Sequence, residues 1–152
     1  MIELADKVFA VKNDPDQLDV NEDVLEHLAE IHPASVSEYI DGDGPVAWIL
    51  VIPTTERLMY MFLENTITEK ELYEQTPVDE QYDVIYLCSA LVLEEYRRKG
   101  ITKRLTLEAI GKIRQDYPIK YLFTWPFSKE GDLASEKIAE EVGLPVFKRQ
   151  HH

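Results

Sequence analysis

Apolar residues recur every three to four positions in three segments of the chain, the spacing of an amphipathic helix. The three stripes are Val24, Leu28 and Ile31; Ile101, Leu105, Ala109 and Ile113; and Ala134, Ile138 and Val142. They predict helices over residues 21–31, 101–117 and 132–142. Pro33 follows the first segment, as is common just beyond the end of a helix.

Apolar runs separate these helices and predict strands, and the continuous apolar run 46–52 is expected to be buried on both faces. The predicted strands are "VAWILVI" (46–52), "YDVIYLCSALVL" (82–93), the run 120–125 before Pro126, "LPVFKR" (144–149) and an edge strand "KVFAVKN" (7–13). The second half of the chain therefore alternates strand and helix, which indicates an α/β sheet.

Capping-box patterns, in which Ser or Thr precedes Glu by three positions, predict two short helices. The pattern at 68–71 begins a helix that ends before Pro77, and the pattern at 35–38 begins one that ends near Ile40. The sequence "DGDGP" (41–45) then predicts a turn.

The segment 54–65 fits two structures. Its apolar residues alternate, as they do in a strand, but it starts with Thr and its interior is rich in Leu and Met. Such residues favour a helix start and a helix interior, so we predict a helix.

The composition of the 152 residues, 45% of them hydrophobic, suits one domain over 1–152 with a proper core. The net charge of -13 argues against nucleic acid as a partner, because binding a polyanion normally needs a basic face. An acidic surface tolerates a cationic or amine-bearing partner, although solubility alone explains it.

The chain is expected to be cytoplasmic. No apolar run approaches the ~20 residues that cross a bilayer, and the N-terminal "MIELADKVFA" lacks the apolar core of a secretion signal. Cys88 is the one cysteine and cannot form an internal disulfide, which fits a reducing compartment. We expect it to be a buried structural residue. His27 and His32 have the wrong spacing for two ligands on one helix face, so no metal is predicted.

Positive charge is concentrated in one place in this acidic chain. Five of the sixteen Lys and Arg residues fall within eight positions around Gly100: Arg97, Arg98, Lys99, Lys103 and Arg104. The start of a helix leaves backbone N–H groups unpaired, and a glycine lets a ligand approach them closely. The segment therefore indicates a phosphate or diphosphate site, with a solvated basic surface as the alternative reading.

The surrounding sequence "ALVLEEYRRKGITKRL" resembles the acetyl-CoA-binding motif of the GNAT acetyltransferase superfamily. The matching positions are Val92, Tyr96, Arg97, Gly100 and Leu105. Two positions depart from the motif: Thr102 replaces a small Gly or Ala, and Glu94 stands where proline is common. The resemblance covers about 82–148. It implies an α/β fold of the α+β type, with a mixed, mostly antiparallel twisted sheet, a splayed parallel strand pair and flanking helices.

The resemblance also implies where acetyl-CoA, the co-substrate, would bind. The pantetheine arm would pair with the backbone of Ala90, Leu91 and Val92, and an N–H of Leu91 or Val92 would meet the oxyanion. The later helix would add Asp132, at a position that commonly holds asparagine, and Ser135.

The diphosphate would bind the backbone amides that follow Arg98. The residues assigned to this part of the site are Arg97, Arg98, Lys99, Gly100, Ile101, Thr102 and Lys103. The basic side chains among them would supply countercharge, and Lys99 or Lys103 would reach the adenosine phosphates.

The usual acid and base of the family are not evident in this chain. Cys88 and Ser89 stand where many members have a glutamate, and Ala139 stands where many have a tyrosine. Water, or the side chains of Ser89, Ser135 or Tyr86, would have to carry the protons.

We therefore expect an N-acetyltransferase that moves an acetyl group to an amine of unknown identity. Two alternatives stay open: a non-catalytic acyl-CoA-binding or regulatory module on the same fold, and an interaction domain with a basic loop. The oligomeric state is also open, with a homodimer as one option.

Overall fold

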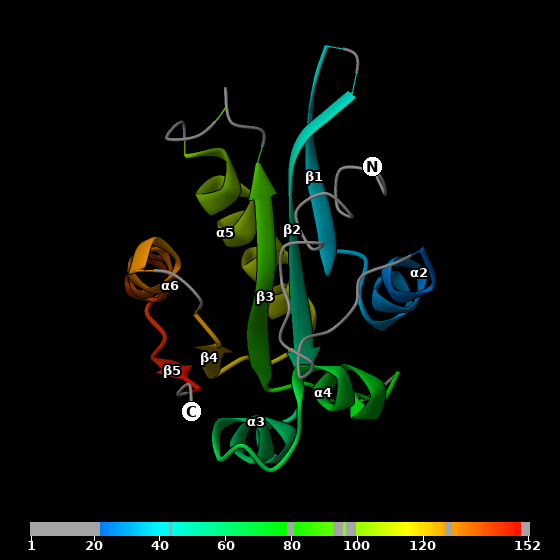
Figure 1. Ribbon diagram of the computed structural model, residues 1–152, viewed down its shortest axis with the longest axis vertical. Helices are drawn as coiled ribbons and strands as arrows, with labels where there is room; N and C mark the ends of the chain where they lie inside the picture. The colour runs from blue at the N-terminus through cyan, green and yellow to red at the C-terminus, as the bar shows by residue number, and fades with distance from the viewer. Residues whose placement is uncertain are drawn as a thin grey trace.

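A computed structural model describes residues 22–42, 44–78, 81–92, 96, 100–126 and 129–149. Within these residues, five strands form one sheet in the order of the sequence (Figure 1). The strands are β1 (Val36–Asp41), β2 (Gly44–Thr54), β3 (Val84–Val92), β4 (Tyr121–Thr124) and β5 (Val146–Lys148). β1, β2 and β3 pair antiparallel, whereas β3, β4 and β5 pair parallel. The sheet is mixed, as predicted, with two antiparallel and two parallel strand pairs.

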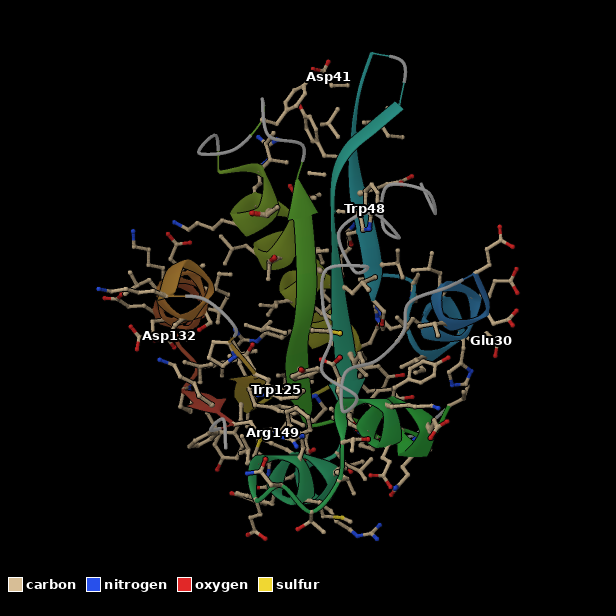
Figure 2. The ribbon with its side chains drawn as sticks, viewed as in Figure 1. Glu30, Asp41, Trp48, Trp125, Asp132 and Arg149 are labelled. Atoms are coloured by element: carbon tan, nitrogen blue, oxygen red, sulfur yellow. The ribbon has the colours of Figure 1, made fainter. Side chains whose placement is uncertain are left out.

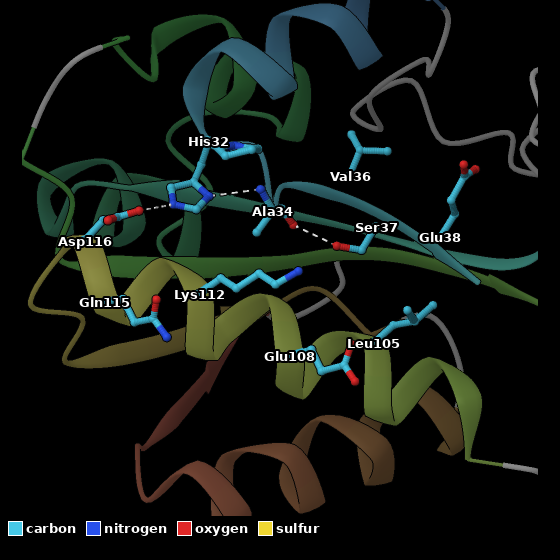
Figure 3. A pocket seen from close by; sticks show the side chains of 11 residues that line it. His32, Ala34, Val36, Ser37, Glu38, Leu105, Glu108, Lys112, Gln115 and Asp116 are labelled. Atoms are coloured by element: carbon cyan, nitrogen blue, oxygen red, sulfur yellow. Dashed lines mark hydrogen bonds and ion pairs between the residues drawn. The ribbon is translucent and has the colours of Figure 1, made fainter. Parts of the chain in front are cut away.

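Five helices in the described part of the chain pack around this sheet. They are α2 (Glu22–Ile31), α3 (Glu56–Leu63), α4 (Glu69–Gln75), α5 (Ile101–Asp116) and α6 (Lys129–Val142). In Figure 1, α5 lies behind the sheet, and α3 and α4 lie at its lower end. Figure 3 shows α2 and α5 on opposite sides of the strands. One hydrophobic core takes side chains from all five helices and from β2, β3 and β4.

Most of the predicted elements are confirmed, and local chemistry explains where they begin. The Thr55 hydroxyl accepts a hydrogen bond from the Leu58 N–H at the start of α3. Thr68 and Glu71 form the predicted capping box of α4, with both bonds at 3.0 Å. The predicted apolar stripe of α5 is buried along its length.

The short helix predicted over 35–40 is wrong, because this segment is the strand β1. It pairs with β2 from Val36↔Leu50 to Asp41↔Gly44, and the Val51 N–H donates to the Ser35 carbonyl at 2.9 Å. A six-residue helix is marginal by itself, whereas pairing with a long buried strand satisfies the same backbone groups. The predicted turn is confirmed between these two strands, and Gly42 has the positive φ of +65° that a tight turn needs.

The last helix begins at Lys129, three residues before the predicted start, and its buried stripe is rotated. Ser135, Ile138 and Ala139 are buried, whereas Ala134, which the apolar pattern placed inside, is exposed. The predicted strand over 7–13 lies outside the described residues. Among the described residues, no helix has the length and apolar character needed to span a membrane.

Candidate functional site

The parallel pairing of β3 with β4 covers only the first half of β3. Their pairing runs only from Val84↔Tyr121 to Leu87↔Thr124, although β3 continues to Val92. From Ser89 to Val92, β3 pairs with β2 on one edge, and within the described part of the chain no strand pairs with its other edge. An unpaired strand edge presents backbone N–H and C=O groups that an extended ligand can use.

A β-bulge lies at the point where the pairing with β4 ends. Leu50 pairs with Ser89, but the next residue of β2, Val51, pairs with Leu87, so Cys88 is an extra residue on β3. A bulge leaves one residue out of the ladder and bends the strand. The pairing with β4 ends directly before this bulge, at Leu87. Ala90 to Val92, the predicted pantetheine-binding residues, lie just beyond it on the same strand.

The helix start that follows the basic loop has the backbone shape expected of a glycine. Gly100 is the N-cap of α5 with φ +73° and ψ 16°, and no side-chain cap occupies its place. A Cβ at Gly100 would meet nothing within 4 Å, so the conformation, not crowding, requires glycine. The end of β3 and the start of α5 lie at the same end of the molecule (Figure 1). The predicted residues Arg97, Arg98 and Lys99 lie outside the described residues.

The other predicted residues after Gly100 are Ile101, Thr102 and Lys103, and each makes a different contact. Ile101 is buried in the core, and the Thr102 carbonyl accepts a hydrogen bond from the Thr106 hydroxyl at 2.7 Å. The Lys103 ammonium lies 2.8 Å from the Glu141 carboxylate of α6, with both side chains about half exposed. Lys103 would have to exchange this partner for a phosphate.

Two contacts tie the loop region to the β1–β2 hairpin. The hydroxyl of Tyr96, a residue of the predicted motif, donates to the Asp41 carboxylate at 2.7 Å. The guanidinium of Arg104 lies 5.2 Å from the centre of the Tyr39 ring. The hairpin therefore contacts one residue before Gly100 in the sequence, Tyr96, and one after it, Arg104.

Asp132 and Ser135 of α6 make bonds within the protein. Asp132 lies 2.6 Å from the ammonium of Lys148, which also contacts Glu136 at 2.6 Å. These two carboxylates raise the pKa of Lys148 above its ordinary value. The buried Ser135 hydroxyl donates to the Asp132 carbonyl at 2.7 Å. A ligand that binds Asp132 or Ser135 would compete with these bonds. The predicted ligand roles of the two residues stay predictions.

Tyr86, predicted as a substitute proton carrier, lies wholly inside the protein. Its hydroxyl donates to Oε2 of Glu69 at 2.5 Å, and the Cys88 thiol lies 3.9 Å from the same oxygen. Burial, followed by the charge of Glu69, raises the pKa of Tyr86 well above its ordinary value, and Arg149 opposes this. Tyr86 is therefore a proton donor to Glu69 and not a base at neutral pH. Cys88 is half-buried and bonded to Glu69, not fully enclosed in the core as predicted.

Aromatic rings and one arginine enclose this polar cluster. The Arg149 guanidinium lies 4.5 Å from the centres of the Phe62 and Trp125 rings, and it donates to Asn65 at 2.7 Å and to the Ile67 carbonyl at 2.9 Å. Figure 2 shows Trp125 and Arg149 together near β4. The arginine is 3% exposed, so its charge acts on its surroundings with little screening by water.

Sequence reasoning missed Glu69, the buried carboxylate of this cluster. It is the first residue of α4, and its side chain is 6% exposed. A signal was available: Glu69 lies three positions before the buried Leu72 and so on the same face of the predicted helix.

A separate cavity of about 380 Å³ lies between the start of β1 and α5 (Figure 3). At one end, His32 is 5% exposed, its Nε2 lies 2.7 Å from the Asp116 carboxylate, and its Nδ1 accepts the Ala34 N–H at 3.0 Å. Since both ring nitrogens are bonded, the histidine has no free nitrogen to act as a base on a ligand here. Within the described part of the chain, no residue of the predicted cofactor site lines this cavity.

Among the described residues, no group of three or more His, Cys, Asp or Glu side chains could hold a metal ion. Comparisons of the chain with protein-family models, with curated proteins and with solved structures gave no match.

Proposed function

We propose that this chain is an N-acetyltransferase of the GNAT type, which transfers the acetyl group of acetyl-CoA to an amine. The observation that carries the proposal is that β3 pairs with β4 only as far as Leu87, directly before the bulge at Cys88. Residues 88–92 of β3 therefore have no pairing partner in β4, and they lie close in sequence to a left-handed Gly100 at the start of a 16-residue helix. A strand edge suits the amides of pantetheine, and a helix start suits a diphosphate.

The reaction needs no covalent intermediate on the protein. A neutral amine attacks the thioester carbonyl, a C–N bond forms, the C–S bond breaks, and the sulfur leaves as the thiol of CoA. A backbone N–H of Leu91 or Val92 would stabilise the oxyanion that develops on the carbonyl oxygen. Acetyl-CoA acts as a co-substrate, and the step requires no metal.

The second candidate is an acyl-CoA-binding module without activity. The bonds already made by Lys103, Asp132 and Ser135 favour it. To take part in the transferase site, each of these side chains would have to exchange its present partner for a ligand, or bind the ligand while it keeps that partner. Calorimetry with CoA and thiol release from acetyl-CoA in the presence of amines separate the two. Binding with turnover supports the transferase, and binding alone supports the module. An interaction domain with a basic loop would bind no CoA.

The Gly100→Glu variant tests the position of the site. A glutamate at the helix start would fill the approach to the amides and repel phosphate, so CoA binding should be abolished. Gly111→Glu is the matched control, since it adds the same charge to an exposed, open position in the middle of α5. Equal affinity of both variants for CoA, with circular dichroism showing both folded, would count against this site.

A further inference from the structure

One face of the β1–β2 hairpin makes both contacts around Gly100. Tyr39 and Asp41 are two positions apart on β1, so their side chains project from the same face of that strand. The Asp41 carboxylate accepts a hydrogen bond from the Tyr96 hydroxyl at 2.7 Å. The Tyr39 ring faces the Arg104 guanidinium, which lies 5.2 Å from its centre. Asp41 lies at the end of the molecule where β3 ends and α5 begins (Figure 2).

Arg104 links the hairpin directly to Gly100. Its side chain faces the hairpin, and its backbone N–H donates to the Gly100 carbonyl at 3.0 Å in the first turn of α5. On the other side of Gly100, the Tyr96 ring packs against the hydrophobic core while its hydroxyl is bonded to Asp41. The bond to Asp41 has a charged acceptor, which makes it stronger than a bond between neutral groups. Both ends of the segment from Tyr96 to Gly100 are therefore fixed by contacts that involve the hairpin.

The segment between these fixed ends is the most basic part of the predicted site. Three residues separate Tyr96 from Gly100, namely Arg97, Arg98 and Lys99, and all three carry positive charge. A segment binds a ligand more tightly when its ends are already fixed, because it loses less conformational entropy on binding. The hairpin therefore acts on the residues that were assigned to the diphosphate.

We propose that the hairpin positions this basic segment for the diphosphate of CoA, an inference that rests on the proposed function of the chain. Asp41 is the positioning residue, and it acts through Tyr96 without touching the ligand. Its charge and its bond have opposite effects on CoA. The negative charge repels phosphate, whereas the bond to Tyr96 fixes the segment that binds phosphate. The sign of the change in CoA affinity therefore separates the two roles.

Calorimetry with CoA compares the wild-type chain with Tyr96→Phe, Asp41→Ala and the double variant. Tyr96→Phe removes only the hydroxyl, and Asp41→Ala removes the acceptor of its bond. We expect each single change to weaken CoA binding about tenfold. The double variant should bind no more weakly than either single variant, because both changes break the same bond. If only the charge of Asp41 mattered, Asp41→Ala would instead bind CoA more tightly.

Two further variants separate positioning from a general effect on the fold. Asp41→Asn keeps an oxygen that accepts from Tyr96 but removes the charge, so its Kd for CoA should stay within about twofold of the wild-type value. Tyr60→Phe is the matched control for Tyr96→Phe. The Tyr60 hydroxyl also donates to a carboxylate, that of Glu56 at 3.3 Å, but it belongs to α3 at the opposite end of the molecule. Tyr60→Phe should leave the Kd for CoA unchanged.

Circular dichroism checks that each variant is folded. A wild-type Kd in Tyr96→Phe, or a tighter Kd in Asp41→Ala, overturns this inference and leaves the proposed function standing. An equal loss of affinity in Tyr60→Phe also overturns it, because the effect would then not belong to the hairpin. A wild-type chain that binds no CoA overturns both proposals. Should Asp41→Ala fail to fold, the comparison of Tyr96→Phe with Tyr60→Phe still decides.

Discussion

The hydroxyl of Tyr86 and the carboxylate of Glu69 meet inside the core, although β3 and α4 bring them from positions 17 residues apart. The bond joins a strand of the sheet to the first residue of a seven-residue helix. A charged acceptor makes this a strong hydrogen bond, and neither group is exposed enough for water to replace it.

Tyr86→Phe should therefore lower the free energy of unfolding by about 1.5–3 kcal/mol, because it leaves a buried carboxylate without its phenol donor. Urea denaturation at pH 7 measures the change. A double-mutant cycle with Glu69→Gln gives the part that belongs to the pair. Additive effects of the two changes would show that the bond contributes little.

The raised pKa of Tyr86 also predicts how stability depends on alkaline pH. The folded chain keeps a proton that the unfolded chain loses above the ordinary tyrosine pKa of 10.0. The unfolded state then binds fewer protons, so the free energy of unfolding falls as the pH rises above that value. Denaturation at a series of pH values, with Tyr86→Phe as the control, should show a smaller fall in the variant.

Gly100 and Gly111 offer a matched pair on one helix. Neither position would crowd a Cβ, but only Gly100 has a positive φ. Gly100→Ala should cost about 1 kcal/mol for the left-handed backbone, whereas Gly111→Ala should stabilise the chain by about 0.5–1 kcal/mol. Thermal unfolding of both variants checks the opposite signs. Two changes of the same sign would contradict the backbone assigned to Gly100.

His32 joins the end of α2 to the end of α5 through its bond to Asp116. His32→Phe keeps a ring in the buried space but leaves the Ala34 N–H without its acceptor, so we expect a loss of about 1–3 kcal/mol in urea denaturation. Gln115→Ala, at an exposed neighbour of Asp116, should change stability by less than about 0.5 kcal/mol. An unchanged free energy of unfolding in His32→Phe would mean that neither ring nitrogen contributes to the stability of the fold.

Arg149 fixes the end of β5 against the loop between α3 and α4. Arg149→Lys keeps the charge but not the planar group that faces two rings and donates to both Asn65 and Ile67. We expect it to lower the free energy of unfolding by about 2 kcal/mol or more. Arg57→Lys, on the exposed side of α3, is the control and should be near neutral. Tryptophan fluorescence in urea follows both variants.

The elements that sequence reasoning predicted correctly are those whose signal is local. The stripe of α5 and the apolar runs of β2 and β3 are properties of consecutive residues, and burial against the sheet follows from them. The segment 35–40 was predicted wrongly because four residues that match a capping box say nothing of pairing with the strand that follows the turn. That pairing, with β2, decides the structure of β1.

The features of the candidate site also fall into those with a local signal in the sequence and those without one. Gly100 at a helix start could be predicted, since a glycine between a strand and a helical stripe is visible in the sequence. The bulge at Cys88 could not, because it depends on how β2 and β3 align across the sheet. For Glu69 the sequence shows that it shares a helix face with Leu72, but its bond to Tyr86 depends on how α4 packs against β3.

Lys103 provides a final prediction, which depends on the proposed function. Its ammonium is paired with Glu141 at 2.8 Å, and a phosphate bound at the start of α5 would compete with that carboxylate. Glu141→Gln should free Lys103 and remove a repelling charge. We therefore expect it to tighten CoA binding about two- to fivefold, with a larger gain at low salt.

Calorimetry with CoA at two salt concentrations measures this effect, and Glu140→Gln is the matched control. Glu140 is an exposed carboxylate on the same helix and carries the same charge. An equal gain in both variants would indicate a general effect of net charge. No gain in Glu141→Gln would show that Lys103 does not meet the phosphates, because a lysine released beside the bound diphosphate must increase the affinity.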